Sequence, residues 1–335
     1  RPPPISTLFP TTTLFRSVFK YENLFPKIPV KLSLNEGDTP LYEIDANVLI
    51  KDESRNPTGS FKDRGMPLLM NEVLINNKLI VATVSTGNAA ISMAKYSKLF
   101  DIKTFLFISK DTEKSKLDYL SNLSIELFFS ENLIYSFEDY FAFCRRNSEV
   151  YTGYLSANPS YLLGLETLSY EMYFQLKKKA PDYILIPCAS GSNIVAQYNA
   201  WANLYRNKLT HKIPIILIIQ IVGGNPIELG FLNKKYDELY VINDPVHSKS
   251  ILSSDTCFNY YKAIEILRLG YAQTISVTDR DIDNFTDDIV FQHCENFDYS
   301  SLSVFAAYKK YRDKLKKDEK VVLIITSGRR NSYES

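Results

Sequence analysis

The chain of 335 residues carries 39 Lys and Arg against 38 Asp and Glu, a balance that indicates no nucleic-acid or other polyanion partner. Its four cysteines are far apart and show no CxxC spacing, so we expect neither a disulfide framework nor a zinc site, and a cytoplasmic setting fits best. The three histidines, His211, His247 and His293, lack metal-ligand spacing, and no metal site is predicted.

Strands and helices alternate along the predicted chain. Apolar runs predict strands at 48–50, 79–84, 104–108, 124–129, 182–187, 215–220 and 321–325. Helical spacing predicts helices at 88–94, 114–120, 137–146, 162–178, 260–269, 281–295 and 301–315. The longest apolar run, 213–222, is about half of the roughly 20 residues that a membrane helix needs, so no membrane span is expected. The alternation predicts an α/β fold with mostly parallel sheets and helices on both faces.

The segment NPTGSFKDRG, 56–65, stands out in this pattern. Pro57 to Gly59 predict a turn, Ser60 is a good N-cap, and Asp63 completes a pair like a capping box. Lys62 then falls in the first helical turn, where free N–H groups and the helix dipole are expected to lower its pKa. A neutral amine is what a Schiff-base lysine requires. The alternative, a solvated lysine at a helix start, is the better interpretation for an arbitrary lysine.

The ten-residue segment resembles the cofactor-lysine motif of threonine synthases, within the fold type II family of pyridoxal 5′-phosphate (PLP) enzymes. The resemblance runs from about Glu36 to Gly328 and implies PLP as the cofactor, carried by Lys62 as an aldimine in the cleft between two lobes. A smaller inserted lobe is expected at 81–150, and a larger one at 1–80 plus 151–335. The resemblance also implies a homodimer. Pro67 lacks an N–H, so the helix should kink or restart there.

A second motif consists of Ser85, Thr86, Gly87 and Asn88, between a predicted strand and a predicted helix. Hydroxyls and free N–H groups at a helix N-terminus form a nest for an anion such as a substrate α-carboxylate. In isolation such a tetrapeptide is more often an ordinary N-cap turn. It resembles, however, the substrate-carboxylate loop of the family, and Asn88 matches the asparagine that also hydrogen-bonds the 3-oxygen of the cofactor ring. Ala89 stands where the family often has threonine.

A third motif lies between the strand predicted at 182–187 and a helix, and comprises Ala189, Ser190, Gly191, Ser192 and Asn193. Small residues there let backbone N–H groups approach a phosphate, and the helix N-terminus adds partial positive charge. The motif resembles the family's cradle for the PLP phosphate, although Ala189 and Ser192 replace expected glycines. A tight turn between a strand and a helix is the alternative.

Thr326 follows the strand predicted at 321–325. It resembles the Ser or Thr that meets the pyridine nitrogen in this family. A neutral hydroxyl leaves that nitrogen mostly unprotonated, and the ring then withdraws electrons less strongly. Without the other motifs, Thr326 would be interpreted as an ordinary residue at a strand end.

The resemblance is weakest around Tyr161, which stands where threonine synthases have an arginine. That arginine is understood to hold the phosphate of O-phosphohomoserine, and a tyrosine cannot reproduce its bidentate, permanently charged clamp. Either another cation, Lys51, Arg55 or Arg64, replaces it at the substrate, or the substrate is not this phosphate ester.

Three functions therefore stay open. The first is a carbon-oxygen lyase like threonine synthase, which converts O-phosphohomoserine and water to threonine and phosphate. The second is PLP-dependent β-elimination or β-replacement on another amino acid, for example an O-substituted serine. The third is a non-catalytic descendant with a binding role. Intact Lys62 and Asn88 argue against the third function, and the glycine-poor loop at 189–192 argues for it.

Overall fold

The computed structural model describes residues 17–26, 28–85, 87–110, 112, 114–123, 125–238, 259–284 and 296–328. Within them the chain divides into two compact units: unit 1 comprises 17–38 and 56–167, and unit 2 comprises 39–55 and 168–328. The predicted smaller lobe, 81–150, lies in unit 1 together with 56–80 and 151–167, which we had expected in the larger lobe. The boundaries differ because helix α1 (Met66–Ile75) packs on helix α2 (Asn88–Leu99). In addition, strand β6 (Val150–Thr152) pairs with β3 (Ile80–Val84).

Unit 1 contains a four-stranded, fully parallel sheet with the order β5-β4-β3-β6. Its strands are β3 (Ile80–Val84), β4 (Lys103–Ser109), β5 (Glu126–Ser130) and β6 (Val150–Thr152). The predicted strands at 79–84, 104–108 and 124–129 are confirmed. β6 was not predicted, because three residues are too few to give a periodic signal.

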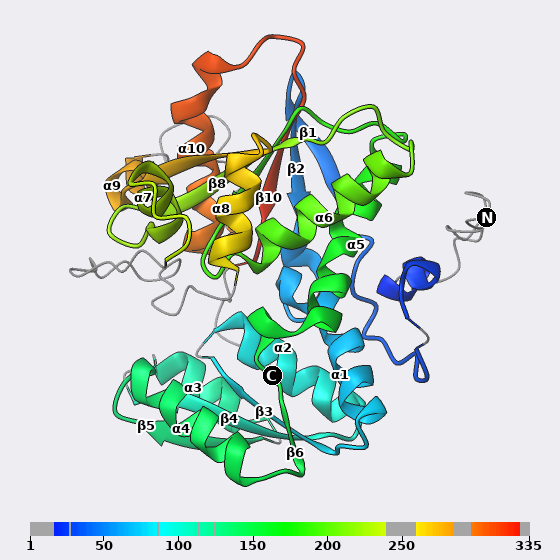
Figure 1. Ribbon diagram of the computed structural model, residues 1–335, viewed down its shortest axis with the longest axis vertical. Coiled ribbons are helices and arrows are strands. Elements are labelled where there is room, and N and C mark those ends of the chain that lie inside the picture. Colours follow the sequence, from blue (N-terminus) through cyan, green and yellow to red (C-terminus); the bar gives the residue numbers. More distant parts are fainter. Residues whose placement is uncertain are drawn as a thin grey trace. The chain divides into compact units, whose positions relative to one another are not determined.

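Helices cover both faces of this sheet, as is usual where all strands are parallel (Figure 1). Along β4 the side chains alternate: Phe105 and Phe107 pack with Tyr140 of α4 (Leu133–Arg146) on one face. On the opposite face Leu106 and Ile108 pack with residues of α2 and α3 (Lys114–Ser121). Two short 3₁₀ helices, η2 (Val18–Leu24) and η5 (Leu155–Ala157), complete the regular structure of unit 1 outside the candidate site.

Unit 2 contains a six-stranded sheet with the order β1-β2-β10-β7-β8-β9. Its strands are β1 (Leu41–Asp45), β2 (Val48–Asp52), β7 (Tyr183–Pro187), β8 (Ile215–Ile221), β9 (Ala272–Val277) and β10 (Val321–Ile325). β1 is antiparallel to β2, and all other pairs are parallel. β9 was not predicted because Gln273 and Thr274 interrupt its apolar pattern.

Unit 2 also contains helices. They are α6 (Ser192–Arg206), α7 (Pro226–Leu232), α8 (Tyr260–Arg268), α9 (Asp279–Asp283) and α10 (Tyr299–Tyr311), followed by η8 (Arg312–Lys314), and α5 (Pro159–Gln175) enters the unit at Leu168. α10 buries Val304 and Phe305 against one face of the sheet, whereas α6 contacts β8 and α8 contacts β9. The helix predicted at 281–295 begins at Asp279 behind a capping box of Thr278 and Asp281, and 285–295 lie outside the described residues.

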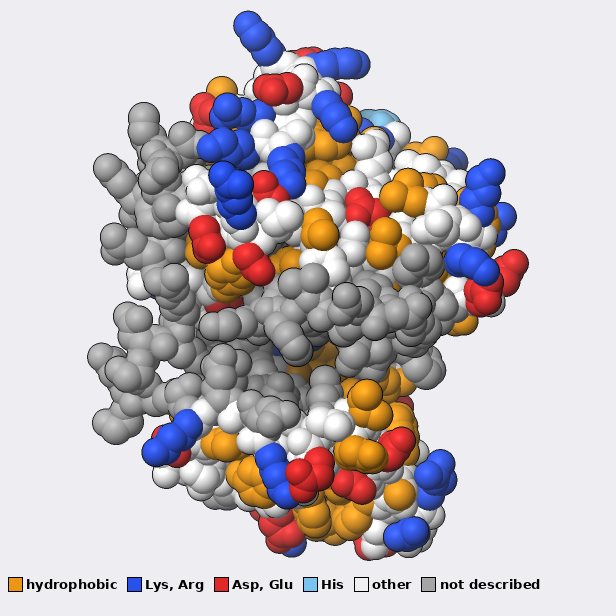
Figure 2. All heavy atoms as spheres, turned by 90° about the vertical axis from the view of Figure 1, so that its left-hand side faces the viewer, with side chains coloured by type: hydrophobic (Ala, Val, Ile, Leu, Met, Phe, Trp, Pro, Cys, Tyr) orange, Lys and Arg blue, Asp and Glu red, His pale blue; other side chains and the backbone are white. Residues whose placement is uncertain are grey.

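One face of the described surface carries charges of both signs (Figure 2). On the face seen in Figure 2, side chains of Lys and Arg lie among those of Asp and Glu, as the formal net charge of +1 leads one to expect. Among the helices that the structure describes, none has both the length and the apolar character needed to cross a membrane.

Candidate active site

Lys62 lies in η4 (Phe61–Gly65), a 3₁₀ helix that follows a tight turn in unit 1. The turn is closed by a hydrogen bond from the N–H of Gly59 to the carbonyl of Asn56 at 2.8 Å, and Gly59 adopts the left-handed conformation with φ of +80°. The Lys62 amine lies 4.6 Å from the centroid of the Phe61 ring. α1 begins directly after η4 with Pro67 in its first turn, so the predicted restart at Pro67 is confirmed.

The predicted capping box of Ser60 and Asp63 is wrong. Ser60 has the extended backbone of an N-cap, but its side chain makes no capping hydrogen bond. The Asp63 carboxylate instead accepts hydrogen bonds from the N–H of Thr58 at 2.6 Å, the hydroxyl of Thr58 at 2.5 Å and the hydroxyl of Ser92 at 2.5 Å. The turn at 57–59 brings Thr58 to the Asp63 carboxylate, and Asp63 therefore does not form the predicted capping box with Ser60. Burial of Asp63 raises its pKa to about 6, although these hydrogen bonds act in the opposite direction.

The predicted carboxylate loop connects β3 to α2 in unit 1. Gly87 is the N-cap of α2, Asn88 is its first residue, and the N–H of Gly87 donates to the Ser85 hydroxyl at 3.3 Å. Ser85, Gly87 and Asn88 are all partly exposed, while Thr86 lies outside the described residues. Three of the four predicted residues thus lie at the carboxyl end of β3, where ligands of parallel sheets bind.

The predicted phosphate loop lies in unit 2, between β7 and α6. Gly191 is the N-cap of α6 with φ of +82°, and Ser190 and Ser192 bring their hydroxyl oxygens to 3.0 Å from each other. Asn259 supports the loop: its side-chain amide donates to the Ser192 hydroxyl at 3.1 Å, and a Cβ on Gly191 would lie 3.1 Å from the Cβ of Asn259. Both the backbone angle and the space therefore require glycine at 191.

This loop fits a phosphate group. The side-chain nitrogen of Asn193 is buried in the first turn of α6 and has no hydrogen-bond acceptor among the described residues. The side-chain oxygen of Asn193 is held by Gln197 at 2.8 Å, and Gln197 is held in turn by Ser169 at 2.6 Å. A fixed amide donor, two hydroxyls and the free N–H groups of a helix start suit an anion such as the PLP phosphate. Ala189 is exposed at the start of this loop.

Thr326 directly follows β10, the neighbour of β7 in the sheet of unit 2. Because the two strands are parallel, Thr326 and the loop at 188–193 leave the sheet at the same edge. Thr326 is buried, and its hydroxyl oxygen lies 3.2 Å from that of Ser301. Ser301 is fixed by Asp298, the N-cap of α10, which accepts its N–H at 2.8 Å.

Tyr161 is fully buried in unit 1. Its ring packs against Gly65, where an added Cβ would lie only 2.2 Å from the Tyr161 Cδ2, and its N–H donates to the Asn158 side chain at 2.7 Å. Burial raises its pKa well above the ordinary value. The structure thus places Tyr161 in the packing beneath η4, and its contact with a substrate stays a prediction.

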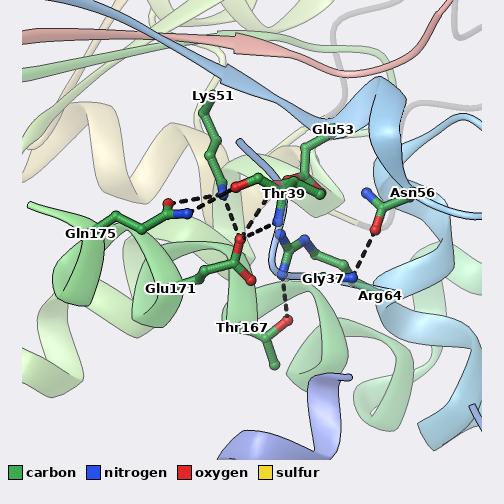
Figure 3. A network of polar contacts seen from close by, with 9 residues as sticks. All are labelled: Gly37, Thr39, Lys51, Glu53, Asn56, Arg64, Thr167, Glu171 and Gln175. Carbon is green, nitrogen blue, oxygen red and sulfur yellow. Dashed lines mark hydrogen bonds and ion pairs between the residues drawn. The ribbon is translucent and has the colours of Figure 1, made fainter. Parts of the chain in front are cut away.

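The three cations considered as replacements for the arginine differ in exposure. In unit 2, Lys51 is fully buried and donates to Glu171 at 2.5 Å, to the carbonyl of Thr39 at 2.6 Å and to Gln175 at 2.9 Å (Figure 3).

In unit 1, Arg64 is also fully buried and donates to the Thr167 hydroxyl at 3.3 Å (Figure 3). The Arg55 side chain in unit 2 is 64% exposed and pairs with Asp52 at 3.2 Å. Of the three, only Arg55 presents its charge to solvent.

Sequence reasoning did not find Ser92, Asn259, Asp298 or Ser301. Ser92, Asn259 and Ser301 contact predicted residues from segments distant in the sequence, and no local motif signals such contacts. Asp298 acts on Ser301 as the N-cap of α10, and an aspartate three residues before the helix predicted at 301–315 is the local signal that could have found it. No group of three His, Cys, Asp or Glu that could hold a metal occurs in the described part of the chain, of which His247 and His293 are not a part.

Comparisons with known proteins identify the family and the fold. The family described as pyridoxal-phosphate dependent enzyme matches residues 32–327. The threonine synthase of Methanosarcina acetivorans is 28% identical, over 92% of this chain and 79% of that protein, and that of Methanocaldococcus jannaschii is 27% identical, over 89% and 77%. Among solved structures, threonine deaminase isoform 2 from Solanum lycopersicum has a TM-score of 0.70 at 16% identity, covering 88% of this chain and 84% of that chain. Maize serine racemase has a TM-score of 0.68 at 19% identity, with 88% of each chain covered. The chain therefore belongs to the family of pyridoxal-phosphate dependent enzymes, with a fold type II architecture and PLP as its cofactor.

Proposed function

We propose that this protein is a carbon-oxygen lyase of the threonine synthase type, which converts O-phosphohomoserine and water to threonine and phosphate. The observation that carries the proposal is the similarity to threonine synthases over 92% of this chain. The segment at 56–65 supports it, because η4 presents Lys62 directly behind a closed turn.

In this proposal Lys62 binds the cofactor covalently and then moves protons at the substrate Cα and Cβ. PLP, when bound, supplies an electron sink for the charge that develops at Cα. Ser85, Thr86, Gly87 and Asn88 bind the substrate carboxylate through hydroxyls and N–H groups at the start of α2, and Asn88 also meets the ring oxygen of the cofactor.

Two elements of unit 2 hold the rest of the cofactor in this proposal. Ala189 to Asn193 bind its phosphate at the N-terminus of α6, where Gly191 permits the close approach. Thr326 meets the pyridine nitrogen with a neutral hydroxyl, whose oxygen lies 3.2 Å from that of Ser301. A neutral partner leaves the ring a moderate electron sink, which suits elimination and water addition more than chemistry that needs a fully protonated ring.

The alternative function is β-elimination or β-replacement on a different amino acid, such as an O-substituted serine. Tyr161 favours it, because a fully buried tyrosine stands where the relatives' phosphate-binding arginine is expected. Lys51 and Arg64 are buried and engaged within their own units, which leaves the exposed Arg55 as the candidate for a substituting cation.

A substrate panel tests the proposal. The PLP-loaded protein should release phosphate and threonine from O-phosphohomoserine, and Lys62→Ala should lose this activity together with the covalent attachment of PLP that borohydride fixes. Lys98→Ala, on the exposed side of α2, serves as the matched control and should retain both. Turnover confined to O-substituted serines would favour the alternative function. A protein that takes up no PLP would contradict both enzymatic functions and leave the non-catalytic descendant.

A further inference from the structure

Asp63, the residue after Lys62, makes contacts that the proposed chemistry does not use. Its carboxylate is fully buried in unit 1 and accepts hydrogen bonds from Thr58 and Ser92 only, all of them from neutral donors among the described residues. A second buried carboxylate, Glu36, lies close enough to raise the pKa of Asp63 further. Removing this charge from water lowers the stability of the fold, and a neutral side chain of similar shape would avoid that loss.

The three hydrogen bonds join segments that carry the candidate catalytic residues. Thr58 precedes Lys62 and Asp63 follows it, so the two contacts with Thr58 close the chain into a loop whose only lysine is Lys62. The third bond attaches this loop to Ser92 of α2.

Ser92 lies one helical turn after Asn88, the first residue of α2. Residues four apart lie on the same face of a helix, so the face that binds Asp63 is also the face on which Asn88 stands. A shift of the loop relative to α2 therefore changes the separation of Lys62 and Asn88.

We propose that Asp63 is a positioning residue, which sets Lys62 relative to Asn88 by binding Thr58 and Ser92 at once. This proposal rests on the roles assigned to Lys62 and Asn88 above. The positioning requires the three hydrogen bonds to Thr58 and Ser92 rather than the negative charge itself. An asparagine at 63 can accept from the N–H of Thr58 with its oxygen and donate to the two hydroxyls with its nitrogen, since a hydroxyl can also accept.

The test compares four variants with the parent protein: Asp63→Asn, Asp63→Ala, Ser92→Ala and the control Ser97→Ala. Ser97 is a buried serine of the same helix, but its hydroxyl bonds the Ala94 carbonyl and the Thr104 hydroxyl instead. Two quantities are measured with PLP alone: its dissociation constant, and the pH midpoint of its visible absorption band. Neither readout requires a substrate.

Ser92→Ala should weaken PLP binding roughly tenfold, which is the scale of one hydrogen bond to a charged group. Asp63→Ala, which loses all three bonds, should weaken it on the order of a hundredfold. Asp63→Asn should stay within about threefold of the parent protein, because it keeps the bonding pattern. The pH midpoint should shift in Ser92→Ala and not in Ser97→Ala, because only the former displaces the amine that is bonded to the chromophore.

The proposal is overturned if Ser92→Ala and Ser97→Ala agree in both PLP affinity and pH midpoint. Ser92→Ala removes a single hydroxyl, so the test stands even where Asp63→Ala does not fold. Lys62→Ala is treated with PLP and borohydride in parallel, and this experiment distinguishes a failure of the role of Lys62 from a failure of the role of Asp63. An adduct that persists in Lys62→Ala refutes the role of Lys62 itself. An adduct lost there, with Ser92→Ala like the control, refutes only the positioning role of Asp63.

Discussion

Two buried carboxylates, Glu171 in unit 2 and Asp63 in unit 1, each accept a hydrogen bond from a threonine but are balanced differently. The N–H of Thr39 donates to Glu171 at 2.8 Å, and the N–H of Thr58 donates to Asp63 at 2.6 Å. The Thr58 hydroxyl also donates to Asp63 at 2.5 Å, whereas the Thr39 hydroxyl donates to Glu53 at 2.6 Å and lies 3.3 Å from Glu171. A further donor to Glu171 is the ammonium group of Lys51, whereas the further donor to Asp63 among the described residues is the neutral hydroxyl of Ser92.

The comparison separates two uses of a buried acid. Lys51 compensates the charge of Glu171 and ties β2 to α5, which is a structural connection within unit 2. At Asp63 the charge stays uncompensated by any cation that donates to it, and burial raises its pKa to about 6. The ammonium group of Lys51 thus offsets the desolvation of the Glu171 carboxylate. Among the described residues, no cation that donates to Asp63 offsets the desolvation of its carboxylate, which lies next to the candidate catalytic lysine in the sequence.

The largest effect is expected from Lys51→Met, which removes the ammonium group that pairs with the Glu171 carboxylate. The variant leaves a carboxylate buried without its ammonium partner, so the free energy of unfolding should fall by about 3–5 kcal/mol. Urea unfolding followed by circular dichroism measures this change. The double variant Lys51→Met with Glu171→Met should recover most of the loss, since it removes both charges. A loss below about 1 kcal/mol in the single variant would show that the ion pair does not compensate Glu171.

The next effect is expected from Asp63→Asn, through the pH dependence of stability. The pKa of Asp63 rises from 3.8 to about 6 on folding, so between these values the unfolded chain releases the proton more readily than the folded chain. The parent protein should therefore lose about 2.4 kcal/mol relative to Asp63→Asn as the pH rises from 4 to 7.

Urea unfolding of both proteins at pH 4 and pH 7 measures this difference. Ser97→Ala is the control, and its difference from the parent protein should be the same at both pH values. A difference between Asp63→Asn and the parent protein that is independent of pH would contradict the raised pKa of Asp63.

The smallest effect is expected from Arg55→Ala, which removes an ion pair whose cation is exposed. The Arg55 side chain is 64% exposed and the Asp52 side chain is 2% exposed, and the Asp52 carboxylate keeps its hydrogen bonds from the N–H and hydroxyl of Ser54. Unfolding free energies should change by about 0.5 kcal/mol or less, and the change should vanish in high salt. A loss comparable to that of Lys51→Met would show that an exposed cation stabilises a buried carboxylate in unit 2 as strongly as a buried cation does.

Most of the fold could be predicted because its strands are apolar runs with local signals. β3, β4, β7, β8 and β10 are buried on both faces and stood out for that reason. β9, with polar residues at its middle, and the three-residue β6 gave no such signal.

The candidate site was predictable as motifs but not as contacts. The turn before Lys62, the start of α2 and the left-handed Gly191 follow from residue types within a few positions of one another. The partner of Asp63 was predicted as Ser60 because a capping box is a local pattern, whereas its actual partners are Thr58 and Ser92. Ser92 belongs to another element, and only tertiary packing brings it there.

The pairing of β2 with β10 has a consequence for synthesis of the chain on the ribosome. The strands of the four-stranded sheet all lie within 80–152, so they can pair soon after they leave the exit tunnel. Val48, by contrast, aligns with Val321, and β2 has only the edge strand β1 beside it until β10 has been translated. The nascent chain must therefore carry the apolar Val48-Leu49-Ile50 segment, with one side of its ladder unpaired, until 321–325 have been translated. This early strand is where a chaperone that shields nascent chains would act on the protein.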